Sequence, residues 1–208
     1  MTKVRNVARG VISNWASLAA SILVGFFLSP FVVHHLGNTA YGIWALVMSL
    51  TSFMSLLDLG MRSTVMLLVS RNYALAQHEE ASKAVSAALF VRAAIGLVII
   101  SFSTVLAFAA PRLFHIPPEM YVAARWAIFI AGVNLAVTLI FGVFGGVLAA
   151  LHRFDLLSGV SVTQMAMRAA GAVWLLRHGH GIVALARWEL FAVLTGNSVL
   201  TRLCFHYY

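Results

Sequence analysis

The stretch LGNTAYGIWALVMSLTSFMSLLDLGMR, residues 36–62, indicates the fold of the chain. After a turn at Leu36-Gly37-Asn38, it is apolar from Tyr41 to Leu57 and interrupted mainly by Ser and Thr. Seventeen residues of α-helix extend about 26 Å, close to the thickness of the hydrocarbon core of a bilayer. The stretch therefore predicts a helix that crosses a membrane. This helix brings Asp58, followed by Leu59 and Gly60, close to the far membrane face.

Composition supports an integral membrane protein. The 208 residues are 62% hydrophobic and 10% charged, with a mean hydropathy of +0.93. An average soluble domain has about 25% charged residues. The formal net charge of +8 does not imply a nucleic-acid partner, because the cytoplasmic loops of membrane proteins are rich in Lys and Arg. The single cysteine, Cys204, excludes an intramolecular disulfide and a cysteine metal cluster.

Hydropathy predicts an all-α protein in which residues 1–208 form a single bundle of six transmembrane helices. The expected spans are residues 11–33, 41–60, 84–110, 121–151, 156–176 and 182–204. Residues 63–76 are also expected to be helical, but they are too short to form a further span. They either extend the second helix out of the bilayer or lie along its surface.

Six spans place both termini on the same side of the membrane. Eight Lys and Arg residues in loops and flanks fall on that side: Lys3, Arg5, Arg9, Arg62, Arg71, Lys83, Arg153 and Arg202. The opposite side has two, Arg112 and Arg177. The positive-inside rule then predicts that both termini are cytoplasmic.

Four arginines fall within the expected spans: Arg92, Arg125, Arg168 and Arg187. An arginine at the centre of a transmembrane helix costs roughly 2.5–3.5 kcal/mol on insertion scales, so it usually faces a cavity or a partner. Arg168 lies twelve residues into its span, about 18 Å deep, whereas the other three could snorkel to a surface. We expect Arg168 to face a cavity. An internal ion pair with Glu189 or Asp58 is the alternative.

The face of the fifth span that carries Arg168 also carries Ser161, Gln164 and Gly171. Gln164 lies one turn before the arginine, and the small residues leave room for a ligand oxygen. A cationic cavity suits an anionic passenger, because arginine binds phosphate oxygens in a bidentate fashion. The predicted binding residues are therefore Arg168 and Gln164, with Arg92, Arg125 and Arg187 as further candidates.

Three residues are candidates for gating or ion coupling: Asn14, Asp58 and Glu189. Asp58 could equally mark a membrane boundary, and Asn14 belongs to a stripe of small and polar residues that suits close helix packing. The His34-His35 and His178-Gly179-His180 segments lack accompanying acids or cysteines at metal-ligand spacing, so they are read as loop residues. We expect neither a metal nor a cofactor. The sequence shows no nucleophile–base arrangement, so we do not expect an enzyme.

The stretch 36–62 resembles the second helix of the polysaccharide flippases, the lipid-linked oligosaccharide transporters of the multidrug/oligosaccharidyl-lipid/polysaccharide exporter superfamily. The matching residues are Leu36, Gly37, Tyr41, Gly42, Trp44, Asp58 and Gly60. Helix 1, with an early Asn and LSPFVVHHLG at its end, and the six-helix layout add to the resemblance. The match covers the N-terminal six-helix lobe of transporters that have twelve or more helices. It therefore implies that a second lobe or a homodimer partner completes the transporter, and that the chain alone does not transport.

The resemblance implies a flippase in the bacterial inner membrane. It would move undecaprenyl-diphosphate-linked oligosaccharide to the outer leaflet during O-antigen, capsule or exopolysaccharide assembly. The expected partners of the protein are this lipid-linked oligosaccharide and the surrounding membrane lipid. One alternative is a multidrug-and-toxin cation antiporter of the same superfamily, which would need acids in its cavity. Another is a membrane scaffold for glycan-assembly enzymes that does not itself transport.

Overall fold

A computed structural model describes residues 22, 26, 28–56, 61–75, 77–151 and 153–207. The described residues contain helices and turns but no strand, which confirms the all-α prediction for this part of the chain. Residues 28–36 are helical, and six α-helices follow. These are α2 (Asn38–Ser55), α3 (Met61–Ala74), α4 (His78–Leu113), α5 (Tyr121–Ala150), α6 (Phe154–Arg177) and α7 (Ile182–Tyr207), with a 3₁₀ turn η2 (Pro118–Met120) before α5.

The expected count of six helices is not confirmed, because the described residues form seven helical segments. The segment beyond the six expected spans is α3, which lies where the short helix over residues 63–76 was expected; its 14 residues extend about 21 Å and are too short to cross a bilayer. Three helices are long and apolar enough to cross a membrane, namely those over Glu79–Leu113, Pro118–Ala150 and Ile182–His206. The six expected spans are thus only partly supported within the described residues.

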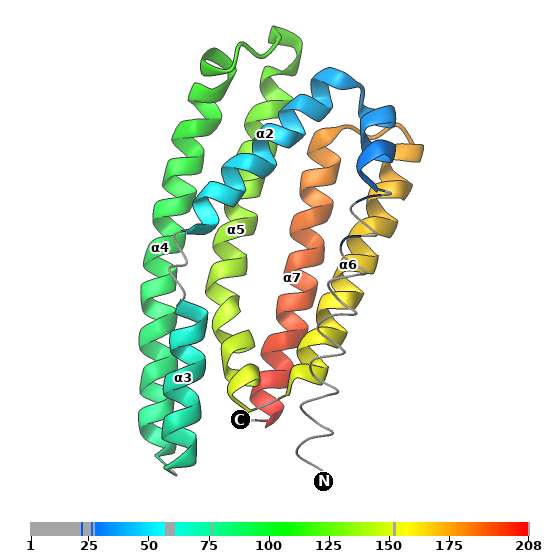
Figure 1. Ribbon diagram of the computed structural model, residues 1–208. Coiled ribbons are helices and arrows are strands. Elements are labelled where there is room, and N and C mark those ends of the chain that lie inside the picture. The colour runs from blue at the N-terminus through cyan, green and yellow to red at the C-terminus, as the bar shows by residue number, and fades with distance from the viewer. Residues whose placement is uncertain are drawn as a thin grey trace.

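The four long helices α4, α5, α6 and α7 alternate in direction and form the body of the bundle, and α2 crosses it obliquely (Figure 1). Helix α5 occupies the centre and packs against α2, α3, α4, α6 and α7. Small residues make this possible, because half of the side chains on α5 are buried and many of them are Gly or Ala. Close approach through small residues is the usual basis of helix packing in membranes.

Helix α4 begins earlier than expected, at His78 rather than near residue 84. Its first turns are polar and therefore unsuited to lipid, but nothing in them breaks a helix. Glu79 and Glu80 lie in the first turn, where the helix dipole favours acids. Lys83 pairs with both at 3.1 and 2.9 Å. Pro111 lies in the last turn rather than in the following loop, so α4 extends over 36 residues and about 54 Å.

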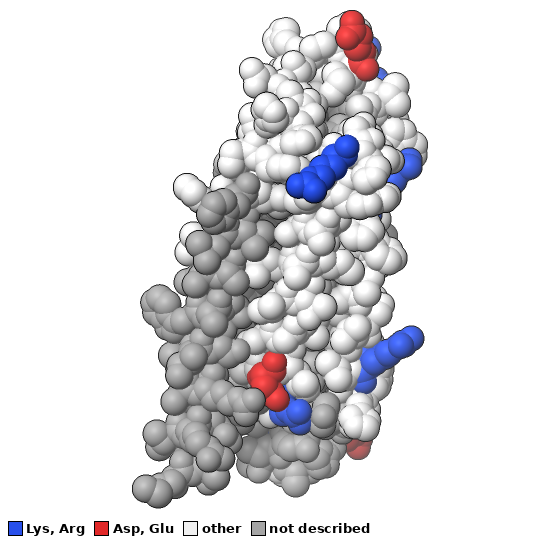
Figure 2. Space-filling model, turned by 90° about the vertical axis from the view of Figure 1, so that its right-hand side faces the viewer, with Lys and Arg blue, Asp and Glu red and all other residues white. Residues whose placement is uncertain are grey.

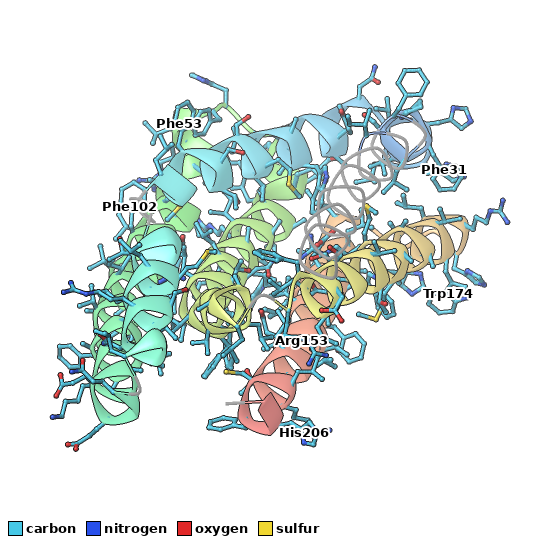
Figure 3. All side chains as sticks on the ribbon, turned by 60° about the horizontal axis from the view of Figure 1, so that its bottom comes forward. Phe31, Phe53, Phe102, Arg153, Trp174 and His206 are labelled. Atoms are coloured by element: carbon cyan, nitrogen blue, oxygen red, sulfur yellow. The ribbon has the colours of Figure 1, made fainter. Side chains whose placement is uncertain are left out.

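One face of the bundle has a band of surface without charge. On the face shown in Figure 2, the Lys, Arg, Asp and Glu side chains of the described residues lie toward the two ends, and the middle carries none. Large apolar side chains are exposed along the helices, including Phe53, Phe102 and Trp174, which point away from the bundle (Figure 3). An apolar belt between two charged ends is the surface that a bilayer requires.

Candidate functional site

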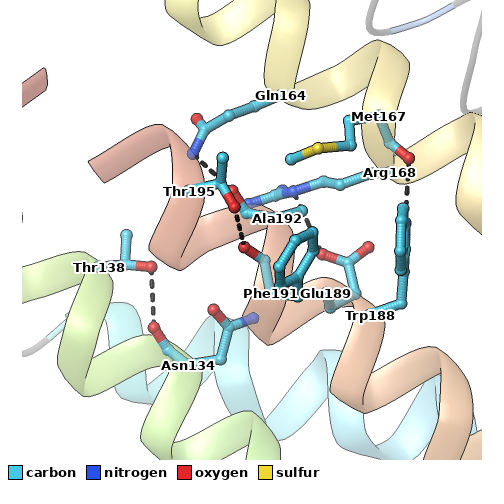
Figure 4. Close-up of polar contacts among 10 residues, drawn as sticks. All are labelled: Asn134, Thr138, Gln164, Met167, Arg168, Trp188, Glu189, Phe191, Ala192 and Thr195. Carbon is cyan, nitrogen blue, oxygen red and sulfur yellow. Dashed lines mark hydrogen bonds and ion pairs between the residues drawn. The ribbon is translucent and has the colours of Figure 1, made fainter. Parts of the chain in front are cut away.

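Gln164 and Arg168, two of the polar side chains predicted on residues 156–176, lie at the contact between α6 and α7 (Figure 4). The Nε atom of Arg168 lies 3.2 Å from Oε2 of Glu189, which forms an ion pair between the two helices. The ion pair with Glu189, the alternative left open by the sequence, is therefore present. Its side chains remain accessible, since Arg168 is 39% exposed and Glu189 25% exposed.

Two further hydrogen bonds connect the same helices on either side of the ion pair. The amide of Gln164 donates through Nε2 to the carbonyl of Ala192 at 3.3 Å. The indole Nε1 of Trp188 donates to the carbonyl of Met167 at 3.0 Å. These contacts fix the face that carries Arg168 toward α7, so the side chains are oriented before any ligand arrives.

The expectation that Gly171 leaves room for a ligand oxygen is wrong. The indole of Trp188 fills the space beside Gly171, so closely that a β-carbon at position 171 would overlap it. The side chain of Gln164 similarly occupies the space over Gly196 on α7. Both glycines permit the close approach of the two helices. The accessible part of this face is therefore the surface around Arg168, together with Ser161, which is exposed.

Helix α5 brings two more polar side chains to this region, Asn134 and Thr138 (Figure 4). The hydroxyl of Thr138 donates to the carbonyl of Asn134 at 2.8 Å, within the helix. The Oδ1 atom of Asn134 is buried and lacks a hydrogen-bond partner among the described residues. A buried acceptor of this kind is costly, so it marks a place where a polar partner is expected. Asn134 falls within the expected span 121–151, but the sequence gives no reason to place it near Arg168.

The other three span arginines do not join this cluster. Arg92 is 2% exposed, and its Nη1 donates to the backbone carbonyl of Leu139 on α5. Arg92 does not snorkel, although the sequence allowed it, because α4 begins at His78, which places this residue about 21 Å into the helix and facing α5. Arg125 lies over the ring of Phe108, 5.2 Å from its centroid, and Arg187 is exposed near the start of α7.

Two of the gating candidates, Asn14 and Asp58, lie outside the described residues. Glu189, the third, is the partner of Arg168. Among the described residues, no group of three or more His, Cys, Asp and Glu side chains is placed to hold a metal ion. That the protein needs neither a metal nor a cofactor remains a prediction.

Apart from the α6–α7 face, the described residues form a hollow between α2, α4 and α5. Its cavity volume is about 10 Å³, and it is lined mainly by apolar side chains, with Thr51 and Ser103 as its hydroxyls. Pockets for drug-sized ligands measure about 300–1,000 Å³, so this hollow is too small for an oligosaccharide. The exposed polar face of α6 and α7 is therefore the better candidate for contact with a large passenger.

These features define a class of protein: a helical, multi-pass membrane protein with an accessible ion pair between two of its helices. Comparison with known proteins identifies the family. Residues 17–174 match MatE, which is more than half of the chain, and the chain belongs to this family of membrane transporters. Membership in a transporter family is consistent with the expectation that the chain is not an enzyme.

The chain also resembles a curated protein described as "Uncharacterized membrane protein EpsK" from Bacillus subtilis (strain 168). The two are 22% identical over 197 residues, which is 94% of this chain and 38% of that protein. The chain thus spans well under half of the length of this relative. No solved structure matches the chain at a significant level.

Proposed function

We propose that the chain forms one lobe of a flippase that moves undecaprenyl-diphosphate-linked oligosaccharide across the bacterial inner membrane for surface polysaccharide assembly. Membership in the MatE family supports transport, and the motifs in residues 36–62 favour the polysaccharide branch of the superfamily. The accessible guanidinium of Arg168 is the observation that carries the choice of an anionic passenger.

In this proposal the diphosphate of the passenger binds Arg168 in place of Glu189. A guanidinium has five N–H donors in a planar fork and suits two phosphate oxygens at once. The ion pair offsets part of the charge of the arginine while the site is empty, which lowers the cost of keeping it within the apolar band. Because the side chain is 39% exposed, a ligand reaches it without unpacking α6 from α7.

Gln164 is proposed as a second contact, since it lies one turn before Arg168 on the same face. Arg125 and Arg187 are proposed to attract the anionic group near one end of the bundle, because both lie in the first two turns of their helices. Arg92 is left out of the proposed contact set because it is buried against α5. A second lobe or a homodimer partner is proposed to cover the exposed polar face, because alternating access requires two bundles that move around a shared site.

The test is a deletion of the gene in its own host. The flippase proposal predicts loss of surface polysaccharide together with accumulation of the lipid-linked unit on the cytoplasmic leaflet. A non-transporting scaffold would instead reduce synthesis of the lipid-linked unit, so it would not accumulate. An unchanged glycan profile combined with loss of cationic dye efflux would contradict the proposal and favour the multidrug antiporter.

The substitution Arg168→Lys refines this test. Lysine keeps the charge but loses the bidentate fork, so we expect partial loss of transport with normal amounts of inserted protein. Transport that equals wild type in Arg168→Lys would show that the fork is not used.

A further inference from the structure

Histidines gather at one end of the bundle. Five of the eight lie at the end that holds the α4–α5 and α6–α7 connections: His34, His35, His115, His178 and His180 (Figure 1). The fixed positive charges described toward this end are Arg112, Arg125, Arg177 and Arg187, and those toward the opposite end are Arg71, Lys83, Arg153 and Arg202. Both ends thus carry fixed positive charge, and the histidine-rich end differs from the other in its larger number of imidazoles.

Two helices at the histidine-rich end finish in the same way. Phe31 is followed four residues later by His35, and Trp174 is followed four residues later by His178. In each case the Nδ1 atom of the histidine lies close to the carbonyl oxygen of the aromatic residue, at 2.9 and 2.7 Å. The histidine ring also packs on the aromatic ring, with centroids 4.1 and 4.6 Å apart.

A glycine in the left-handed region then ends each helix. Gly37 has φ 78° and Gly179 has φ 72°, a conformation that glycine adopts at low cost. The two helix ends lie beside each other, because Val32 packs in one apolar cluster with Leu175 and Leu176 of α6. Figure 3 shows Phe31 and Trp174 on the same side of the bundle.

We call the exposed cationic and titratable side chains of these two ends the histidine corner. All of its members are exposed: His34, His35, Arg177, His178 and His180. The ring of His180 stacks near Trp174 at 6.1 Å, and that of His34 meets His35 edge-on at 5.6 Å. The corner is therefore a surface of aromatic and imidazole rings around one permanent positive charge.

The backbone contacts determine how two of these rings respond to acid. A carbonyl oxygen only accepts hydrogen bonds, so Nδ1 of His35 and of His178 must carry the proton. In the neutral ring, Nε2 then presents a lone pair, which repels an anion. Histidine is the side chain that ordinarily gains a proton between pH 8 and pH 5. Protonation makes Nε2 an N–H donor with a positive charge, without rotation of the ring.

The neighbouring elements add few other titratable groups. Helix α6 contributes Arg177, and α2 contributes Tyr41, whose hydroxyl lies 3.2 Å from that of Ser29. The first turn of α7 contains no charged residue, and the exposed Arg187 follows in its second turn. Of the described acids toward this end, Glu119 belongs to η2 in the α4–α5 connection and Glu189 is paired with Arg168. The corner is thus cationic when its histidines are protonated.

We propose that the histidine corner is a binding site for the phosphate of an anionic phospholipid headgroup, and that binding strengthens as the pH falls. Trp174 is 57% exposed beside the corner, and exposed tryptophan at a helix end is typical of the level where lipid headgroups lie. Arg177 supplies the constant attraction, and the four histidines supply the part that depends on pH. The site is separate from the α6–α7 ion pair and does not require the proposed transport function.

The test uses the full chain in a neutral detergent, titrated with dihexanoyl phosphatidylglycerol and with dihexanoyl phosphatidylcholine at about pH 5.5 and about pH 8. We expect phosphatidylglycerol to bind at least about tenfold more tightly at the lower pH, and phosphatidylcholine to show no such change. Substituting Gln for all four corner histidines should remove the pH dependence and leave weak binding through Arg177. His206→Gln, an exposed histidine at the opposite end, is the matched control and should behave as wild type.

Three results would overturn the proposal. The first is equal binding of phosphatidylglycerol at both pH values. The second is a pH dependence that survives the four substitutions or is lost in His206→Gln. The third is full competition by inorganic phosphate at the concentration of the lipid, which would show that the corner takes free phosphate rather than a headgroup. A normal thermal unfolding midpoint of the fourfold variant confirms that lost binding reflects the corner and not the fold.

Discussion

Arg92 and Arg168 are both arginines deep within apolar helices, but their surroundings differ. Arg92 is 2% exposed between α4 and α5, where its guanidinium donates to the carbonyl of Leu139 and lies against Gly142. Arg168 is 39% exposed between α6 and α7 and pairs with Glu189. The first contact holds two helices together, and the second also presents a charge to the outside. Depth along a helix therefore does not decide the role of an intramembrane arginine, whereas the face it occupies does.

The largest effect on stability is expected for Arg92→Ala. Truncation leaves a cavity between α4 and α5 and removes a charged hydrogen bond, so we expect a loss of about 2–5 kcal/mol. A fall in the thermal unfolding midpoint and in the yield of monodisperse protein in detergent would measure it. A midpoint equal to wild type would show that the α4–α5 contact does not depend on this arginine.

Gly171→Ala should have the next largest effect. A β-carbon there meets the rigid indole of Trp188, so we expect overpacking to cost about 1–3 kcal/mol. Gly196→Ala is the matched comparison, because its β-carbon meets the flexible side chain of Gln164, which can move away. The unfolding midpoints of the two variants, measured side by side, should therefore differ. The opposite order would mean that Trp188 is not held against α6.

Glu189→Gln is expected to change stability less. The ion pair is partly exposed, so its removal should cost at most about 1 kcal/mol. Removing the internal competitor should also increase the affinity of Arg168 for a diphosphate, which titration with farnesyl diphosphate would measure. Weaker binding in Glu189→Gln would indicate that the carboxylate helps to hold the ligand rather than competing with it.

The smallest effect on stability is expected for Arg187→Ala. This side chain is exposed near the start of α7, so the change in the free energy of unfolding should stay within about 0.5 kcal/mol. The unfolding midpoint is again the measurement. A large loss would place Arg187 in a contact comparable to that of Arg92 and remove the distinction between buried and accessible arginines.

Much of the fold follows from the sequence, because apolar runs end at Pro, Gly and charged residues. The starts of α5 and α7 coincide with the expected residues 121 and 182, and α6 differs by two residues at its start and one at its end. The start of α4 was predicted six residues too late. Hydropathy detects only the residues that are apolar enough for lipid, whereas the helix also includes the polar residues His78–Lys83. Hydropathy measures a transfer free energy and not backbone hydrogen bonding.

The candidate site was harder to predict, because it depends on which helices meet. The spacing of Gln164, Arg168 and Gly171 defines one face, but it does not reveal that α7 covers part of it. From the sequence, Glu189 and Asp58 were both possible ion-pair partners of Arg168, and nothing in the spacing favoured one over the other. The buried position of Arg92 follows from the packing of α4 on α5, which local sequence does not encode.

The most direct test compares Arg168→Ala with Arg92→Ala in the host, by measuring inserted, folded protein and transport of the lipid-linked unit in the same cells. Arg168→Ala should keep a nearly normal amount of folded protein and lose at least about tenfold in transport, which corresponds to about 1.4 kcal/mol of transition-state stabilisation. Arg92→Ala should lose folded protein, with transport reduced in proportion. Normal transport by normal amounts of Arg168→Ala, or a loss of folded protein that accounts for its whole defect, would contradict the assignment of Arg168 as the substrate contact.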